Sequence, residues 1–201
     1  MTLVDKLRWN DSGREAPGDL GGALVMSGNS ESTLSEGYAI SFLKQHQPMP
    51  DDSRLSEELI AEYDAVRRYL TSNPSEACLP LLLRSFGRGT GLGVYPMMDS
   101  VLWPLPRDFV VAQLKEALTS DNPNVRFWCS DLALEFPDRA LIDVLGPLLL
   151  NDDHDGTRFN AAAILADIEG EQDRVSVLFR HAIEKETDEE VRTLLRQHLG
   201  Q

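Results

Sequence analysis

The chain has 201 residues, 42% of them hydrophobic, which is enough apolar material for one folded domain with an appendage. Its formal net charge is −14, so it repels nucleic acids and anionic membrane surfaces on average and attracts basic proteins. The first residues lack the apolar run of a signal peptide, and no later stretch approaches a transmembrane length. We therefore expect a cytoplasmic protein with neither a nucleic-acid nor a membrane partner.

The first fifty residues have little helical pattern. Residues 10–37 are rich in Gly, Ser and acidic side chains around a brief apolar stretch, ALVM, which predicts a loop with at most one short strand. Residues 38–47 predict a short helix, and residues 48–53 a break that ends on a helix N-cap. We assign residues 1–50 to a loop-rich N-terminal segment and residues 51–201 to a helical domain.

Two helices are predicted at the start of the helical domain. Between residues 55 and 70 the apolar side chains recur at spacings of three and four, which places Leu59, Tyr63, Val66 and Leu70 on one helical face. The stretch ACLPLLLRSF follows the turn TSNPSE and predicts a second, strongly apolar helix, with Pro80 tolerated in its first turn.

Residues 87–106 form a long glycine- and proline-rich insertion, which predicts a loop with a binding role. Its stretch GRGTGLG resembles a phosphate-cradling loop only superficially, because it follows a helix and contains no lysine. The insertion also carries Tyr95, Met97, Met98 and Trp103, which either anchor a partner or fill the core of the first repeat. We expect Trp103 to pack into the core, and we take Tyr95, Met97 and Met98 as candidate partner-binding residues.

A repeated pattern begins after the insertion. Apolar helices are predicted at residues 111–118, 141–150 and 175–183, and each is followed by a polar turn and a second helix. The turns align as SDNPNVR, DDHDGTR and ETDEEVR, which end at Arg126, Arg158 and Arg192. Self-similarity at a period of 32 to 34 residues predicts an array of stacked helix pairs.

The aspartates in these turns have a local role in this interpretation. Asp121 and Asp153 come just before a helix, where a carboxylate accepts hydrogen bonds from free amides and favours the positive end of the helix dipole. An arginine in a first helical turn is poorly placed for that dipole, so we expect it to pair with a carboxylate or carbonyls of a neighbouring turn.

An apolar helix, an Asp-containing turn, then Val-Arg and an Ala-rich helix resembles a HEAT repeat, especially the short repeats of bilin lyases. The resemblance covers residues 108–201 and extends loosely to 55–86, where Ala77 replaces the arginine. It implies an all-α fold, a short α-α superhelix. It also implies ladders that tie adjacent repeats together, formed by three aspartates and three arginines: Asp121, Asp153, Asp188, Arg126, Arg158 and Arg192.

Signatures of catalysis or cofactor binding are weak. The four histidines form no HExxH motif, and the acidic run around His154 lacks the spacing of a calcium-binding loop. Cys78 and Cys129 each sit among apolar residues, as small core side chains do. We therefore expect no metal, no cofactor and no enzymatic activity, and treat a bilin-lyase-type enzyme as the least favoured alternative.

A protein-binding role remains. Stacked helix pairs present a surface formed mainly by their second helices, and the candidate contact residues there and in the turns are acidic: Asp121, Asp131, Glu135, Asp152, Asp153, Asp155 and Asp167. Small acidic HEAT-like proteins resemble bacterial immunity proteins that neutralise toxins, so the resemblance favours an inhibitor of a basic toxin such as a nuclease. The alternative is a general scaffold or regulatory adaptor.

Overall fold

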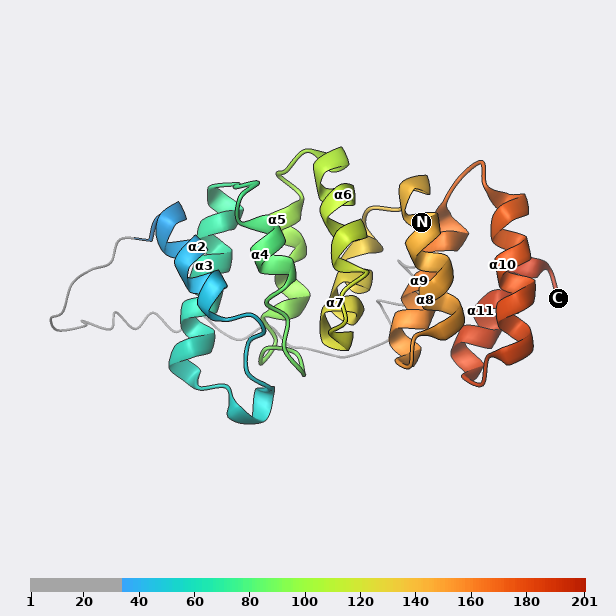
Figure 1. Ribbon diagram of the computed structural model, residues 1–201, viewed down its shortest axis with the longest axis horizontal. Coiled ribbons are helices and arrows are strands. Elements are labelled where there is room, and N and C mark those ends of the chain that lie inside the picture. Colours follow the sequence, from blue (N-terminus) through green and yellow to red (C-terminus); the bar gives the residue numbers. More distant parts are fainter. Residues whose placement is uncertain (1–33) are drawn as a thin grey trace, which may run out of the picture. The chain divides into compact units, whose positions relative to one another are not determined.

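The computed structural model describes residues 34–201, which form one compact unit, Leu34–Gln201 (Figure 1). The predictions for residues 1–33, including the short strand, lie outside the described residues. Every regular element within residues 34–201 is helical. The α-helices are α2 (Glu36–Gln45), α3 (Glu57–Ser72), α4 (Leu79–Leu83), α5 (Asp99–Leu102), α6 (Arg107–Ala117), α7 (Pro123–Ala133), α8 (Ile142–Asn151), α9 (Asp155–Asp167), α10 (Gln172–Lys185) and α11 (Glu189–Leu199).

The first helices begin where serine caps are available. The side chains of Ser35 and Ser56 accept hydrogen bonds from backbone N–H groups in the first turns of α2 and α3. The start of α3 therefore lies beyond the break at residues 48–53, because a 3₁₀ turn, η1 (Asp52–Arg54), occupies the position where we expected the cap. Phe42 of α2 is buried, so residues 34–50 pack with the helical domain.

The insertion at residues 87–106 is only partly a loop. A 3₁₀ turn, η2 (Tyr95–Met97), and helix α5 occupy its second half, because apolar residues recur there at helical spacing and become buried. What remains irregular is residues 87–93, the glycine loop, followed by the connection to α6.

Three helix pairs follow: α6 with α7, α8 with α9, and α10 with α11. The predicted helices at residues 111–118, 141–150 and 175–183 are confirmed, as are their partners. The second helices of the pairs contact one another in order, α7 with α9 and α9 with α11. The expected all-α stack of HEAT-like helix pairs is therefore the fold of this part of the chain.

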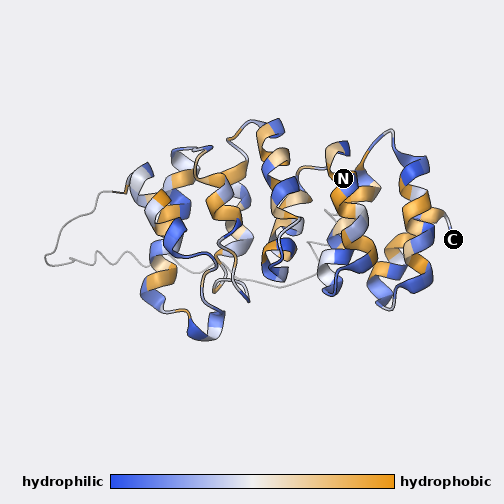
Figure 2. Cartoon of the chain, viewed as in Figure 1, coloured by the Kyte–Doolittle hydropathy of each residue, from blue (hydrophilic) through white to orange (hydrophobic). Residues whose placement is uncertain are grey.

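The core lies both within the helix pairs and between successive pairs. Figure 2 shows orange apolar stretches on the helices and hydrophilic residues at the turns below them. Leu145 of α8 and Leu165 of α9 are fully buried. Each such side chain contributes about 1.5 to 3 kcal/mol when removed from water. Burial of one apolar face per helix therefore holds the pairs together.

The turns that enter the second helices share one edge of the unit, at the bottom of Figure 1. We call residues 118–122, 152–154 and 186–188 the turn edge. The glycine loop lies on the same edge, and Trp128 of α7 ties it there, because its indole Nε1 donates to the carbonyl of Gly89 at 3.0 Å.

Candidate functional site: the turn edge of the repeat stack

Arg126 joins one helix pair to the next on the turn edge. Its Nε donates to Oδ2 of Asp152 at 2.6 Å, and its Nη1 donates to the carbonyls of Ser120 at 2.9 Å and Asp121 at 3.2 Å. The Asp152 side chain is only 1% exposed. The guanidinium therefore connects the turn before α7 with the turn before α9 and neutralises a buried carboxylate.

Arg158 repeats this arrangement one pair later, with two parallel bonds. Its Nε and Nη2 donate to the two carboxylate oxygens of Glu186, both at 2.8 Å, and its Nη1 donates to the carbonyl of Asp152 at 2.9 Å. Burial favours a higher pKa for Glu186, but hydrogen bonds from Arg158 and two backbone N–H groups outweigh it and hold that pKa below its ordinary value. We call the Arg126–Asp152 and Arg158–Glu186 pairs the ladder.

The carboxylates of the ladder differ from those implied by the HEAT resemblance. We expected Asp121, Asp153 and Asp188, whereas the structure uses Asp152 and Glu186. The signal lies in the first position of the aligned windows, which reads Ser, Asp, Glu. An acid stands there only where the preceding window ends in arginine, because that arginine reaches forward to it.

The expected capping roles also need correction. The side chain of Asn122 caps α7 by accepting from the N–H of Asn124 at 3.0 Å, and Asp188 caps α11. Asp121 and Asp153 precede the cap position, so they contribute their carbonyls to the ladder and leave their carboxylates exposed.

Arg192 breaks the pattern. Its Nε is buried with no hydrogen-bond partner among the described residues, and its Nη1 lies 3.6 Å from Glu189 of its own helix. No further turn comes after it within residues 193–201, so no carboxylate occupies the position that Asp152 and Glu186 fill for the other two arginines. The three arginines are therefore equivalent in sequence but not in bonding.

The acidic candidates for partner binding separate into three groups. Asp152 is wrong as a contact residue, because it is buried in the ladder. Asp121, Asp153 and Asp155 are exposed on or beside the turn edge. The remaining three are half-buried, and each interacts with another group of the protein: Asp131 on α7, Glu135 in the turn after α7, and Asp167 at the end of α9.

The candidates of the insertion are also divided. Tyr95 and Met98 are fully buried, so their assignment to partner binding is wrong: they fill the core because η2 and α5 turn them inward. Met97 is 41% exposed and remains a candidate. Trp103 is 64% exposed, contrary to the expectation that it packs into the core, because it follows the last residue of α5.

The glycine loop holds an anion, but the anion belongs to the protein. The backbone N–H groups of Thr90 and Gly91 donate to the carboxylate of Asp52, each at 2.9 Å, and the Thr90 hydroxyl adds a bond at 3.2 Å. Backbone amides arranged in this way form an anion-binding concavity. Asp52 fills it, which explains why GRGTGLG resembles a phosphate loop only superficially.

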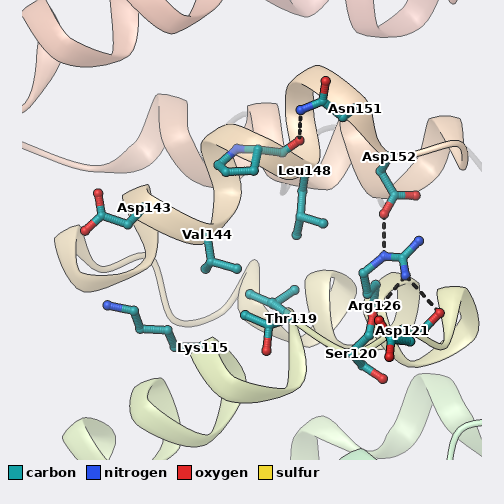
Figure 3. A pocket seen from close by; sticks show the side chains of 12 residues that line it. Lys115, Thr119, Ser120, Asp121, Arg126, Asp143, Val144, Leu148, Asn151 and Asp152 are labelled. Carbon is teal, nitrogen blue, oxygen red and sulfur yellow. Dashed lines mark hydrogen bonds and ion pairs between the residues drawn. The ribbon is translucent and has the colours of Figure 1, made fainter.

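A groove opens between α6 and α8 next to the turn edge (Figure 3). We call this cavity of about 570 Å³ the α6–α8 groove. Its apolar lining comes from Leu118, Val144, Pro147 and Leu148, and Figure 3 shows Lys115 and Asp121 towards its opposite ends. The volume is in the range of ligand-binding clefts.

The seam that holds the groove differs in its contacts from the seam that follows it. Helix α6 contacts the 3₁₀ turn η3 (Arg139–Leu141), which lies in the connection between α7 and α8. Helix α8 contacts α10 directly, with Leu178 about 3.3 Å from a Cβ built on Gly146, so the next seam holds only about 250 Å³. The seam between α6 and α8 is therefore the more open of the two, and apolar side chains line much of it.

Comparison with known proteins agrees with this architecture. Residues 111–200 match the family model described as HEAT repeats, and the match covers the three helix pairs that form the ladder apart from the first residues of α6. This part of the chain is therefore HEAT-like in sequence as well as in fold. No curated protein matches the chain at a significant level. Among the described residues, no helix is long and apolar enough to cross a membrane.

Proposed function

We propose that this protein is a non-catalytic binding module that uses its turn edge to hold a basic protein partner. One observation carries the proposal. In the ladder, Arg126 and Arg158 pair with the buried acids Asp152 and Glu186. The carboxylates of Asp121 and Asp153 stay exposed and unpaired among the described residues. The edge therefore presents negative charge that no side chain of this unit compensates.

Stacked helix pairs support this role by holding the acids at fixed spacing. The ladder fixes the turns relative to one another, so exposed carboxylates of successive turns keep one geometry in the free and bound states. Preorganisation of this kind reduces the entropy lost on binding. The match to HEAT repeats supports the broader statement that the module is a scaffold or adaptor for another protein.

The cysteines and the potential metal ligands give little support to a catalytic function. Burial raises the pKa of both Cys78 and Cys129, so neither thiol is an activated nucleophile. Among the described residues, no group of three or more His, Cys, Asp or Glu side chains is arranged to hold a metal ion.

Neutralisation of a toxin is the narrower form of the proposal. The net charge of −14 supports it, because an acidic inhibitor associates rapidly with a nuclease and covers its basic substrate groove. Co-expression of the chain with its captured partner tests this form. Rescue of growth from a toxic partner supports it, and a partner without toxicity leaves the adaptor role.

The turn-edge proposal is tested with two triple variants of equal net charge. One changes Asp121, Asp153 and Asp155 to Asn. The control changes three exposed acids near the opposite ends of the helices: Asp108→Asn, Glu169→Gln and Asp173→Asn. Affinity capture from the source cell provides the partner, and surface plasmon resonance then measures its association rate constant with each variant from about 20 to about 500 mM salt, a range over which screening changes strongly.

We expect the turn-edge variant to associate about tenfold more slowly at low salt, and the control to associate at nearly the unaltered rate. Rising salt slows the unaltered chain and reduces the difference. Equal rates for both variants contradict a turn-edge contact, and a salt-independent rate contradicts an electrostatic one.

A further inference from the structure

We propose that the α6–α8 groove receives an apolar side chain of the basic partner, from a segment in which that side chain directly neighbours a Lys or Arg. This inference rests on the proposed function, since it names the type of segment that the turn edge holds. Its basis is a cavity that combines an apolar surface with a carboxylate that has no partner in the described part of the chain.

The floor of the groove suits an aliphatic side chain. Val144 and Leu148 of α8 lie on one side and Leu118, after the end of α6, on the other, and the exposed ring of Pro147 extends the apolar surface outward. Burying a leucine or methionine here removes apolar surface on both molecules from water. The volume of about 570 Å³ has room for such a side chain and part of its backbone.

The charged residues at the rim of the groove indicate which residue type lies next to that apolar side chain in the partner. Arg126 and Asp152 neutralise each other in the groove wall, and Asp143 pairs with Arg174 at 2.6 Å. Among residues 34–201, Asp121 thus remains as the unpaired carboxylate at the end next to the turn edge, whereas Lys115 lies towards the other end (Figure 3). A cation beside the apolar side chain therefore lies at the Asp121 end, away from Lys115.

Other openings on this edge fit such a segment less well. The seam between α8 and α10 holds about 250 Å³ and is lined mainly by polar groups, including Lys185, Glu186 and Thr187. The glycine loop already binds the Asp52 carboxylate. The α6–α8 groove is the cavity that joins an apolar floor to the exposed acids.

Two matched synthetic peptides serve as probes. Both have the same length and the same number of lysines. One carries leucines at spacings of three and four, and the other carries glutamines at those positions, so that they have equal charge and differ only in whether these side chains are aliphatic or polar. Isothermal titration calorimetry measures their dissociation constants with the full chain. We expect the leucine peptide to bind at least about tenfold more tightly, the gain expected from burying one aliphatic side chain.

Thr119→Trp blocks the groove from an exposed position on its rim. Thr187→Trp is the matched control, because Thr187 is exposed on the same edge and adds the same bulk at the next seam. We expect the preference for the leucine peptide to disappear in Thr119→Trp and to persist in Thr187→Trp. Circular dichroism melts confirm that both variants fold.

The outcomes separate this inference from the proposed function. Equal affinity for the two peptides, or a leucine preference that survives Thr119→Trp, overturns the groove assignment. If the triple Asn variant at Asp121, Asp153 and Asp155 still weakens both peptides in that case, the acidic turn edge stands without the groove. If the triple variant binds both peptides as tightly as the unaltered chain, the turn edge fails and the groove inference fails with it.

Discussion

Arg126, Arg158 and Arg192 occupy the same position in their windows, yet only the first two reach a carboxylate in the next turn. The difference arises because a ladder bond needs an acid contributed by the next helix pair, and no pair comes after Arg192 within residues 193–201. Arg126 and Arg158 therefore act as structural joints. Their charges are not available to a phosphate or to a partner.

Removing a joined arginine should cost much more stability than removing Arg192. Arg126→Ala and Arg158→Ala each leave a buried carboxylate without its counter-ion, and we expect each to lower the free energy of unfolding by about 2 to 3 kcal/mol, less than for a fully buried pair because the arginines keep partial exposure. Arg192→Ala breaks only a contact of 3.6 Å on its own helix and should cost less than about 1 kcal/mol. Urea denaturation measures all three, and equal losses would contradict the ladder.

At the scale of elements, the glycine loop is a rigid part of the fold. The N–H of Met49 donates to the carbonyl of Ser85 at 2.8 Å, and the N–H of Asp52 to that of Arg88 at 3.1 Å, so residues 49–52 run close beside residues 85–88. Trp128 and Asp52 then fix the remainder of the loop. Interactions with two separate parts of the chain, residues 49–52 and Trp128, therefore hold this glycine-rich stretch in place.

Gly87 is required by this close approach. A Cβ at Gly87 would lie 2.1 Å from the carbonyl oxygen of Met49, and a backbone atom cannot turn aside as a side chain does. We expect Gly87→Ala to lower the free energy of unfolding by about 3 kcal/mol. Gly37→Ala is the control: nothing lies within 4 Å of a Cβ there, and alanine should stabilise α2 by about 0.5 to 1 kcal/mol. A neutral Gly87→Ala variant, measured by urea denaturation, would show that residues 49–52 can move away.

At the scale of the molecule, the stability of each helix pair depends on its contacts with the neighbouring pairs. Each helix pair of the repeat contacts its sequence neighbours, and the ladder crosses each boundary with one ion pair. In such arrays stability is approximately a sum of the pairs and their interfaces. A change at one boundary should therefore loosen the adjacent pair before the whole unit unfolds.

The boundary before α10 and α11 should respond to acid. Because the pKa of Glu186 lies below its ordinary value of 4.5, its pair with Arg158 contributes fully to stability above that value and loses its contribution as pH falls through the lower, folded-state pKa. Hydrogen exchange of α11, corrected for the intrinsic effect of pH, should speed up as pH falls to about 4 and below. In Glu186→Gln, exchange should already be faster at about pH 7 and should change little with acid. If hydrogen exchange of α11 in the unaltered chain does not depend on pH, the predicted link between Glu186 ionisation and the stability of α11 is contradicted.

Periodic patterns were the most reliable guide to the fold. Spacings of three and four predicted the three helix pairs, and the aligned windows predicted that their turns are equivalent. Partial errors occurred where bonding depends on a distant residue. Tyr95 and Met98 are buried by η2 and α5, and Asp152 by Arg126 of the preceding pair. The sequence named the exposed acids Asp121, Asp153 and Asp155 as candidates, but it could not distinguish them from Asp152, which is buried.

The sequence by itself determined the helical class, the period of the repeat, the acidic charge and the position of each arginine, because these depend on local spacing and composition. Only the tertiary structure decided which acid each arginine meets, which side chains of the insertion are buried, and that Asp52 fills the glycine loop. It alone revealed the α6–α8 groove. Each of these depends on how far apart two helices come to rest, and that distance is set by packing between segments distant in the sequence.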